Sequence, residues 1–225
     1  MPKRVPTYGY CRASVQLLAL GLIVAALLAV APARARTLQV VALGDSLTAG
    51  LGLPPGQGFP ETLEKALRAK GYDVAISNAG VSGDTAADGL ARYDWAVPAG
   101  ADALIVELGA NDMLRGLDPA AAKASLAAIL TRAKAAHMAI LLTGMRAAPN
   151  MGADYQARFD AIYPDLAKSF DVPLYPFFLD GVAADPKLTQ HDGLHPNATG
   201  VGIIVERILP KVQELIAGVQ VRHRS

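Results

Sequence analysis

The sequence predicts an α/β protein, a three-layer sandwich in which helices cover both faces of a central, mostly parallel sheet. Apolar segments of strand length alternate along the chain with longer segments of helical pattern. Several of the strand-like segments are continuous apolar runs, which is typical of strands buried on both faces. We therefore expect a doubly wound sheet, and in such sheets ligands bind beyond the carboxyl ends of the strands.

Five apolar runs are expected to form the strands of this sheet. The third run is apolar except for Glu107, and the fifth is short. Most of these runs read as buried strands because they lack the strict alternation of a half-exposed strand. In chain order the expected strands are residues 38–43, 73–80, 103–108, 138–145 and 172–177.

Helical patterns separate the expected strands. Gly71 is expected to end the first helix, and Pro119 stands where a proline favours the start of the third, which is dense in good helix formers. Apolar side chains at three- and four-residue spacing from Phe159 to Phe170 predict one buried helix face. The expected helices are residues 61–70, 84–93, 120–137, 155–170 and 198–217.

Residues 1–35 are interpreted as a secretory signal peptide, set apart from a single domain at residues 36–225. Basic residues precede an apolar run at 17–31, and Ala33-Arg34-Ala35 supplies the small-residue cleavage site. The run is shorter than the ~20 residues of a spanning helix, so no stable membrane span is expected after cleavage. An uncleaved N-terminal anchor is the alternative. The expected location is periplasmic or secreted.

Charge and cysteine content exclude several classes of function for the chain after that cleavage. Four basic residues and no acidic residue precede the cut, so the 21 basic and 20 acidic residues of the whole chain reduce to a formal charge of −3. A basic surface for nucleic acid is therefore not expected. The one cysteine, Cys11, also precedes the cut, which leaves no thiol for disulfides or thiolate chemistry.

Polar corners stand at the carboxyl ends of the first three expected strands, and we expect all three at one edge of the sheet. They are Gly44-Asp45-Ser46, residues 78–83 and residues 109–112. Ser46 is a candidate nucleophile, because a hydroxyl fixed at a strand end can attack once a base takes its proton. The backbone N–H groups of Ser46 and Gly83 and the side-chain amide of Asn111 are candidate donors to an oxyanion. Simple turns remain the alternative for Gly83 and Asn111.

The base is expected in "QHDGLHPN", residues 190–197. Asp192 and His195 are three positions apart, so on a turn the carboxylate can accept a hydrogen bond from Nδ1 of the imidazole. Nε2 is then available for the proton of Ser46. Two alternatives stay open: Asp192 as a turn or capping residue, and His191 with His195 as metal ligands, although no H-E-x-x-H pattern is present.

Four blocks of the sequence, "GDSLTAG", "SGDT", "GAND" and "DGLHPN", resemble in their order the blocks that define the SGNH hydrolases, also called the GDSL esterase/lipase family. The segment "FDAIYPDLAKSFDVPLYPFFLDGV" is similar to the bacterial branch of thioesterase I, protease I, lysophospholipase and arylesterases. The resemblance implies a flavodoxin-like sandwich that needs no cofactor and cleaves carboxylic esters and thioesters. It implies Ser46 as nucleophile, His195 as base oriented by Asp192, and Gly83 and Asn111 as oxyanion partners.

The implied substrate is a small ester, a thioester or a lysophospholipid. Two flexible segments, residues 50–60 and 146–155, are expected to rim the site, although both can be plain surface loops. The apolar side chains expected to receive an acyl or aryl group are Leu51, Leu53, Met145 and Met151.

Two other functions are weighed against this one. A carbohydrate O-acetyl esterase of the cell envelope would use the same triad, but its site should be open, polar and aromatic, and the chain has one tryptophan, Trp95. A non-catalytic binding module on the same fold would lack any explanation for Asp192 and His195, and no phosphate-loop motif follows the first strand.

Overall fold

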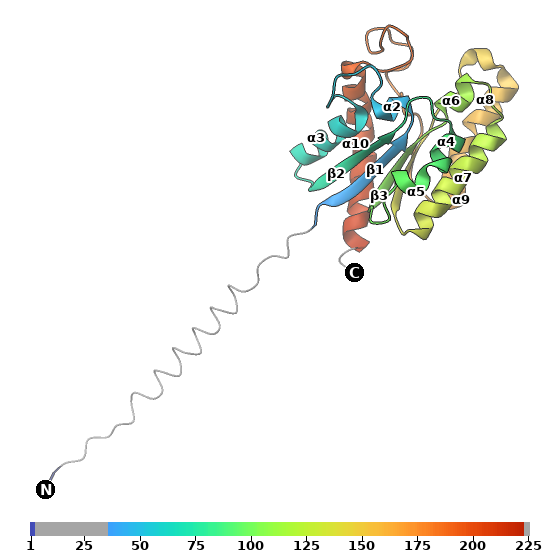
Figure 1. The fold of residues 1–225 in the computed structure, drawn as a ribbon. Coiled ribbons are helices and arrows are strands. Elements are labelled where there is room, and N and C mark those ends of the chain that lie inside the picture. The colour runs from blue at the N-terminus through green and yellow to red at the C-terminus, as the bar shows by residue number, and fades with distance from the viewer. Residues whose placement is uncertain (3–35, 223–225) are drawn as a thin grey trace. The chain divides into compact units, whose positions relative to one another are not determined.

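The computed structural model describes residues 1–2 and 36–222. The signal peptide expected at residues 1–35 therefore lies outside the described residues. From Thr37 onward the chain forms one compact unit (Figure 1).

Five parallel strands form a single sheet in the order β2-β1-β3-β4-β5. The order runs outward from β1 in both directions, and helices connect the successive strands, as parallel pairing requires. The predicted α/β fold with a parallel central sheet is confirmed. The strands are β1 (Leu38–Gly44), β2 (Val74–Gly80), β3 (Ala103–Glu107), β4 (Ala139–Thr143) and β5 (Leu174–Tyr175).

Helices cover both faces of the sheet, as Figure 1 shows. α3 and α10 pack together on one face, and α4, α7 and α9 lie on the other. The short helices α2 and α6 follow β1 and β3 directly. The helices are α2 (Ser46–Ala49), α3 (Phe59–Ala69), α4 (Ala86–Ala91), α5 (Tyr93–Ala96), α6 (Ala110–Leu114), α7 (Pro119–Ala135), the 3-10 turn η1 (Pro149–Met151), α8 (Ala153–Asp160), α9 (Ile162–Phe170) and α10 (Ala198–Arg222).

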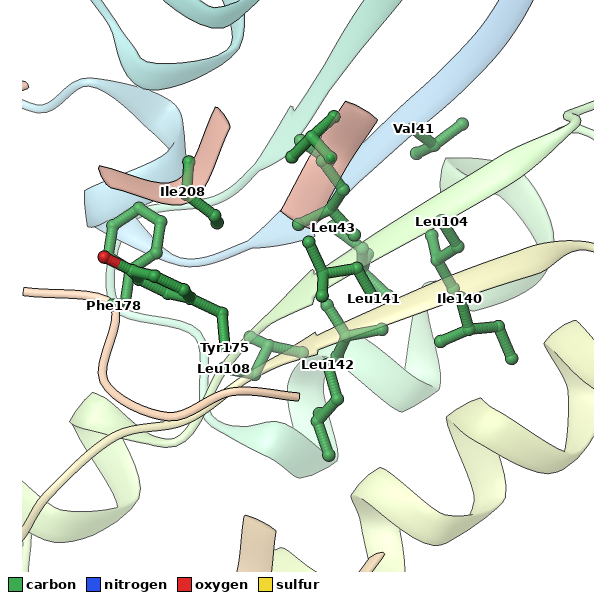
Figure 2. Close-up of a cluster of buried hydrophobic side chains, with 14 of the residues drawn as sticks. Val41, Leu43, Leu104, Leu108, Ile140, Leu141, Leu142, Tyr175, Phe178 and Ile208 are labelled. Atoms are coloured by element: carbon green, nitrogen blue, oxygen red, sulfur yellow. The ribbon is translucent and has the colours of Figure 1, made fainter. Parts of the chain in front are cut away.

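The core lies between the sheet and these helices, and Figure 2 shows part of it. Strands β1, β3 and β4 are buried along almost their whole length, which explains their uninterrupted apolar sequences. Full burial of one Leu, Ile, Val or Phe side chain contributes about 1.5–3 kcal/mol. The side chains labelled in the figure are Val41, Leu43, Leu104, Leu108, Ile140, Leu141, Leu142, Tyr175, Phe178 and Ile208.

The helical segment predicted at residues 155–170 is two helices, α8 and α9, which meet at Ala161. Pro164 explains the break, because it has no N–H to donate to the carbonyl of Asp160. The ladder resumes one residue later, where the N–H of Asp165 donates to the carbonyl of Ala161 at 3.2 Å. The prediction of a single helix was wrong, because the spacing of the apolar side chains is not changed by a proline that lacks a backbone N–H.

Other helix boundaries depend on capping side chains. Thr85 and Asp88 form a capping box that starts α4 later than the predicted residue 84. Asn197 accepts the N–H of Gly200 at 3.0 Å and so starts α10 where the sequence predicts it. α10 continues to Arg222, beyond the predicted end at residue 217. Among the described helices, none is both long and apolar enough to cross a membrane.

The ends of three neighbouring strands are aligned, which confirms that the polar corners share one edge. Gly44 pairs with Gly80 on β2 and with Glu107 on β3. Gly80 also allows α2 to pack against the end of β2: a Cβ at this position would lie 2.3 Å from the nitrogen of Ala49 and 2.7 Å from its Cα. This close approach places the last residue of α2 against the sheet edge.

Gly80→Ala is expected to lower the free energy of unfolding by about 1–3 kcal/mol, because the added Cβ meets backbone atoms that no rotamer change can move. Gly202→Ala is the matched control, since a Cβ there meets no described atom within 4 Å and Ala favours the helix interior by up to about 1 kcal/mol. Urea unfolding of both variants measures the difference. Equal destabilisation by the two substitutions would contradict the close packing of α2 on β2.

Candidate active site

Ser46 is the first residue of α2, directly after the end of β1. Asp45 caps this short helix: its Oδ1 accepts the N–H of Leu47 at 2.9 Å. The corner is tight, because a Cβ on Gly44 would lie 2.0 Å from Oγ1 of Thr48 and 2.7 Å from the carbonyl oxygen of Glu107. Ser46 is 8% exposed, so its hydroxyl is held at a rigid edge with limited access to water.

His195 reaches this hydroxyl from the loop between β5 and α10. Its Nε2 lies 2.8 Å from Oγ of Ser46. The loop is closed by a hydrogen bond from the N–H of Gln190 to the carbonyl of His195 at 2.7 Å. The side-chain amide of Gln190 also donates to the carbonyl of Leu51 at 2.7 Å, which ties the loop to the segment that follows Ser46. Two separate parts of the chain are thereby held together at the hydroxyl.

Asp192 contacts the other nitrogen of the same imidazole. Its Oδ2 lies 2.6 Å from Nδ1 of His195, and its Oδ1 accepts the backbone N–H groups of Leu194 at 2.9 Å and His195 at 3.0 Å. The backbone hydrogen bond from His195, followed by that from Leu194, lowers the pKa of Asp192 to about 2. The carboxylate is thus ionised at neutral pH and fixes the orientation of the ring.

Both ring nitrogens of His195 are therefore engaged, Nδ1 with Asp192 and Nε2 with Ser46. This geometry affects the two alternatives considered for these residues, a metal site at His191 and His195 and a turn role for Asp192. A metal shared by His191 and His195 would have to displace one of these contacts, and it would separate the imidazole from the hydroxyl or from the carboxylate. Asp192 does form turn hydrogen bonds, but the same carboxylate also reaches the imidazole, so its turn role and its contact with His195 coexist.

Gly83 and Asn111, the other candidate oxyanion partners, lie beside Ser46 along one cavity. Gly83 has φ +90°, a conformation that glycine adopts without a Cβ penalty. The side-chain amide of Asn111 donates to the carbonyl of Asp84 at 3.0 Å and to Oδ2 of Asp45 at 3.2 Å. To donate to an oxyanion, this amide would exchange one of these hydrogen bonds.

A pair of buried carboxyl groups, Asp45 and Glu107, lies next to the nucleophile. Oε2 of Glu107 accepts the hydroxyl of Thr48 at 2.8 Å and the N–H of Asp45 at 3.4 Å. Burial raises the pKa of Asp45 to about 6 from its ordinary value of 3.8. Burial, and then the neighbouring charge of Asp45, raise the pKa of Glu107 well above its ordinary value. In the sequence, the buried acid at this site is marked by Glu107, an acidic residue within an otherwise apolar strand.

Arg92 is a second buried polar residue at this edge. Its Nε donates to Oδ2 of Asp84 at 2.5 Å, and its guanidinium donates to the carbonyl of Gly44 at 2.8 Å. The side chain thereby joins the corner after β1 to the corner after β2. Because both carboxylate and carbonyl are satisfied, this ion pair stiffens the two corners instead of leaving a buried charge unpaired.

A cavity of about 510 Å³ opens over Ser46 and His195. Its walls come mainly from α6 and from the segments after β4 and β5, and they are largely apolar. Of the four predicted substrate contacts, Leu51 and Met145 line the cavity. Leu53 and Met151 do not, and instead pack partly buried against the core. The remaining lining residues are Leu47, Gly83, Ala110, Asn111, Met113, Leu114, Arg146, Ala147, Ala148, Pro149, Phe177, Leu179, Ala183, Ala184, Gly193 and Leu194.

Comparison with known proteins agrees with this fold and identifies the family of the chain. Residues 42–203 match the GDSL-like Lipase/Acylhydrolase family. The chain is 40% identical over 185 residues to Esterase TesA of Pseudomonas aeruginosa, covering 82% of this chain and 91% of that protein. It is 39% identical over 175 residues to Thioesterase 1/protease 1/lysophospholipase L1 of Escherichia coli K12, covering 77% and 83%. The chain therefore belongs to the GDSL-like lipase/acylhydrolase family.

Solved structures show the same relationship. The crystal structure of AlinE4, an SGNH-hydrolase family esterase, is 48% identical in sequence and has a TM-score of 0.68, covering 80% of this chain and 96% of that one. The crystal structure of TesA has a TM-score of 0.75 at 36% identity, covering 79% and 99%. The resemblance to the SGNH hydrolases inferred from the four sequence blocks is confirmed, as is the fold class that it implied.

Glu107→Gln is expected to make stability less dependent on pH. The raised pKa of Glu107 means that the folded state binds its proton more tightly than the unfolded state, so this stabilisation is complete below about pH 4.5 and is lost as the pH rises. Gln cannot ionise but keeps an acceptor oxygen for Thr48. The free energy of unfolding of the variant, relative to the wild type, should therefore increase between pH 4.5 and 8 in urea titrations.

A difference that stays constant across this pH range would contradict the raised pKa. Glu107→Ala serves as a comparison, because it removes the acceptor of Thr48 and leaves a cavity. At pH 4.5 it should lower the free energy of unfolding by about 2 kcal/mol or more, and this loss should shrink as the pH rises, because only the wild type carries the titrating carboxyl group.

Proposed function

We propose that this protein is a serine hydrolase that cleaves carboxylic esters and thioesters through an acyl-enzyme. The observation that carries the proposal is the continuous chain of contacts from Asp192 through His195 to Ser46, 2.6 Å and 2.8 Å long, at the floor of an apolar cavity. Membership of a lipase/acylhydrolase family and the esterase and thioesterase names of the relatives support it.

In the first half of the reaction, Oγ of Ser46 attacks the carbonyl carbon of the ester while its proton passes to Nε2 of His195. Negative charge develops on the carbonyl oxygen, which takes hydrogen bonds from the proposed donors at Ser46, Gly83 and Asn111. The tetrahedral intermediate then collapses. The bond to the alcohol or thiol breaks, and the leaving group takes the proton from Nε2.

The second half hydrolyses the acyl-enzyme. Nε2 of His195 removes a proton from a water molecule, whose oxygen attacks the acyl carbon. Collapse of this second intermediate releases the carboxylic acid and returns the proton to Oγ of Ser46. Throughout, the ionised Asp192 stabilises the imidazolium that forms in each half, without itself taking up the proton.

The substrate classes we propose are small esters, thioesters and lysophospholipids. Apolar cavity walls suit an acyl or aryl group, and Leu51 and Met145 are the predicted contacts that lie on them. The alternative of a carbohydrate O-acetyl esterase is not favoured: sugar rings stack on aromatic side chains, but Trp95 lies outside the cavity lining, and the ring of Phe177, which does line the cavity, is stacked with Arg146. A non-catalytic module would leave the three converging side chains without a purpose.

We propose further that residues 1–35 are removed as a signal peptide and that the domain at residues 36–225 acts in the periplasm or outside the cell. The supporting pattern is the basic segment, the apolar run and the Ala-Arg-Ala site in the sequence. An exported enzyme would meet lipids and external esters, and it would meet little cytosolic acyl-CoA. Export therefore favours ester or lysophospholipid substrates over thioesters in the cell.

Ser46→Ala is expected to reduce kcat for 4-nitrophenyl butyrate by about 10³-fold or more, because the nucleophile is removed while oxyanion donors remain. Asp192→Asn should lower kcat by a comparable order, through the wrong imidazole tautomer. Far-UV circular dichroism should show both variants folded.

Turnover retained by pure Ser46→Ala protein would overturn the assignment of Ser46 as the nucleophile, as would a serine-directed phosphonate whose adduct maps to another residue. Activity lost in EDTA and restored by zinc would revive the metal hypothesis.

Expression of the full-length chain in a bacterium with a periplasm should yield a mature protein that begins at Arg36, because cleavage is expected after Ala35. N-terminal sequencing of the periplasmic fraction measures this. An intact N-terminus recovered only with the membrane fraction would instead establish the uncleaved anchor.

A further inference from the structure

Among the described residues, the lining of the cavity above Ser46 includes one permanently charged side chain, that of Arg146. Apart from the imidazole of His195, every residue on its lining is uncharged except Arg146. Arg146 follows Met145, a few residues beyond the end of β4, in the segment that forms one wall. Arg146 is exposed, and among the described residues it makes no hydrogen bond to Ser46, His195 or Asp192, so its charge is available to a group of the substrate.

Arg146 also differs from the other arginines whose side chains the structure describes. In that part of the chain Arg68, Arg92, Arg132, Arg158 and Arg207 each pair with a carboxylate, and Arg115 donates to a backbone carbonyl. For Arg146 no hydrogen-bond acceptor or acidic partner occurs among the described residues. Its N–H donors are therefore left for solvent or for a bound ligand.

An aromatic ring holds this guanidinium in place. Its central carbon lies 5.1 Å from the centroid of the Phe177 ring, and Phe177 lines the same cavity. Stacking uses the flat face of the guanidinium and leaves its N–H edge available, which is the edge that binds carboxylate or phosphate oxygens in pairs. When a substrate fills the cavity and displaces water, attraction between this cation and an anionic group increases.

We propose that Arg146, oriented by Phe177, forms an anion subsite that selects esters carrying a carboxylate or phosphate group. This inference rests on the proposed function, because the subsite acts on substrates that Ser46 cleaves. Carboxylate and phosphate share the chemistry that a guanidinium recognises, and the charge can stand on the acyl part or on the alcohol part of the ester. Arg146 is thus a specificity-determining residue, and it takes no part in bond making or breaking.

The test compares charged and neutral esters of similar size in two arms. The acyl arm pairs mono-4-nitrophenyl glutarate, which is anionic, with neutral 4-nitrophenyl pentanoate. The alcohol arm pairs 4-butanoyloxybenzoate with its neutral methyl ester. For each pair, kcat/KM is measured for the wild type, Arg146→Met and Arg146→Lys, and the ratio between variants cancels the intrinsic reactivity of each ester.

Arg146→Met should lower kcat/KM about tenfold for the anionic ester of at least one arm and less than about threefold for its neutral partner, as expected for one lost charge-assisted hydrogen-bond pair. Arg146→Lys should recover part of the loss, since it keeps the charge but not the planar fork. Added salt should reduce the preference of the wild type for the anionic ester and leave Arg146→Met nearly unaffected.

Arg132→Met is the matched control variant. Arg132 is also stacked on an aromatic ring, 5.7 Å from the centroid of Tyr93, but it is paired with Asp94 and lies outside the cavity lining. The substitution changes the net charge by the same amount, so any long-range effect of charge on anionic substrates appears in both variants. The subsite predicts a selective loss in Arg146→Met alone.

The arm that responds identifies the part of the ester that carries the recognised charge. Equal losses for charged and neutral esters would overturn the proposal and leave Arg146 a structural role in the cavity wall. If kcat/KM of Arg146→Met equals that of the wild type for all four esters, the proposal is also overturned. The same is true if Arg132→Met shows the same loss of kcat/KM for the anionic ester. A wild type that hydrolyses none of the four esters would refute the proposed function, and the subsite with it, which is a different result from an unchanged kcat/KM.

Discussion

One hydrogen bond, 2.8 Å from Oγ of Ser46 to Nε2 of His195, joins two segments that lie 149 residues apart in the chain. General base catalysis works only when donor and acceptor are within hydrogen-bond reach, so both segments have to be placed to within a fraction of an ångström. The hydroxyl is fixed by the junction of β1 and α2, which packs tightly on β2. The imidazole is fixed by its own carboxylate partner and by Gln190, which ties the histidine loop back to Leu51. The aligned ends of β2, β1 and β3 supply the common edge on which these placements depend.

The same edge holds polar groups that a fold selected for stability alone would avoid. Burying a carboxyl group is costly unless hydrogen bonds compensate, and Asp45 and Glu107 are both almost fully buried there. Oε2 of Glu107 is satisfied by Thr48, whereas Oε1 has no hydrogen-bond partner among the described residues. Glu107 accepts hydrogen bonds from Asp45 and Thr48, which stand on either side of Ser46 in the sequence, so the buried acids hold the nucleophile in position. We infer that a fixed hydroxyl is the gain that offsets the cost of the buried acids, as expected where local rules are broken at a functional site.

Features that are local in sequence could be predicted, and features created by tertiary contact could not. Short strand-like segments, several of them continuous apolar runs, located every strand, and the three-residue spacing of Asp192 and His195 was enough to anticipate their contact. The break at Ala161 was missed because Pro164 removes a single hydrogen-bond donor without altering the apolar pattern. The function of Glu107 and the bridging role of Arg92 depend on neighbours 48 to 62 residues away, for which no spacing rule exists. Likewise, Leu53 and Met151 belong to the predicted rim segments, but only the fold determines which side chains of a loop turn toward a cavity.

Around the cavity, the residues proposed for the chemical reaction and the residues proposed for the choice of substrate lie on different parts of the fold. Residues that would carry out bond breaking stand on strand ends and short helices whose geometry is fixed by the sheet. Residues that would choose the substrate stand mostly on the connections after β4 and β5, including Arg146 and Phe177. Loops on a rigid scaffold tolerate change without disturbing the sheet, so substrate choice can vary while the chemistry stays constant. Four short sequence blocks therefore suffice to assign the chain to its family and reaction class. The cavity wall, where the guanidinium of Arg146 has no acidic partner among the described residues, is where this protein's own substrate preference has to be sought.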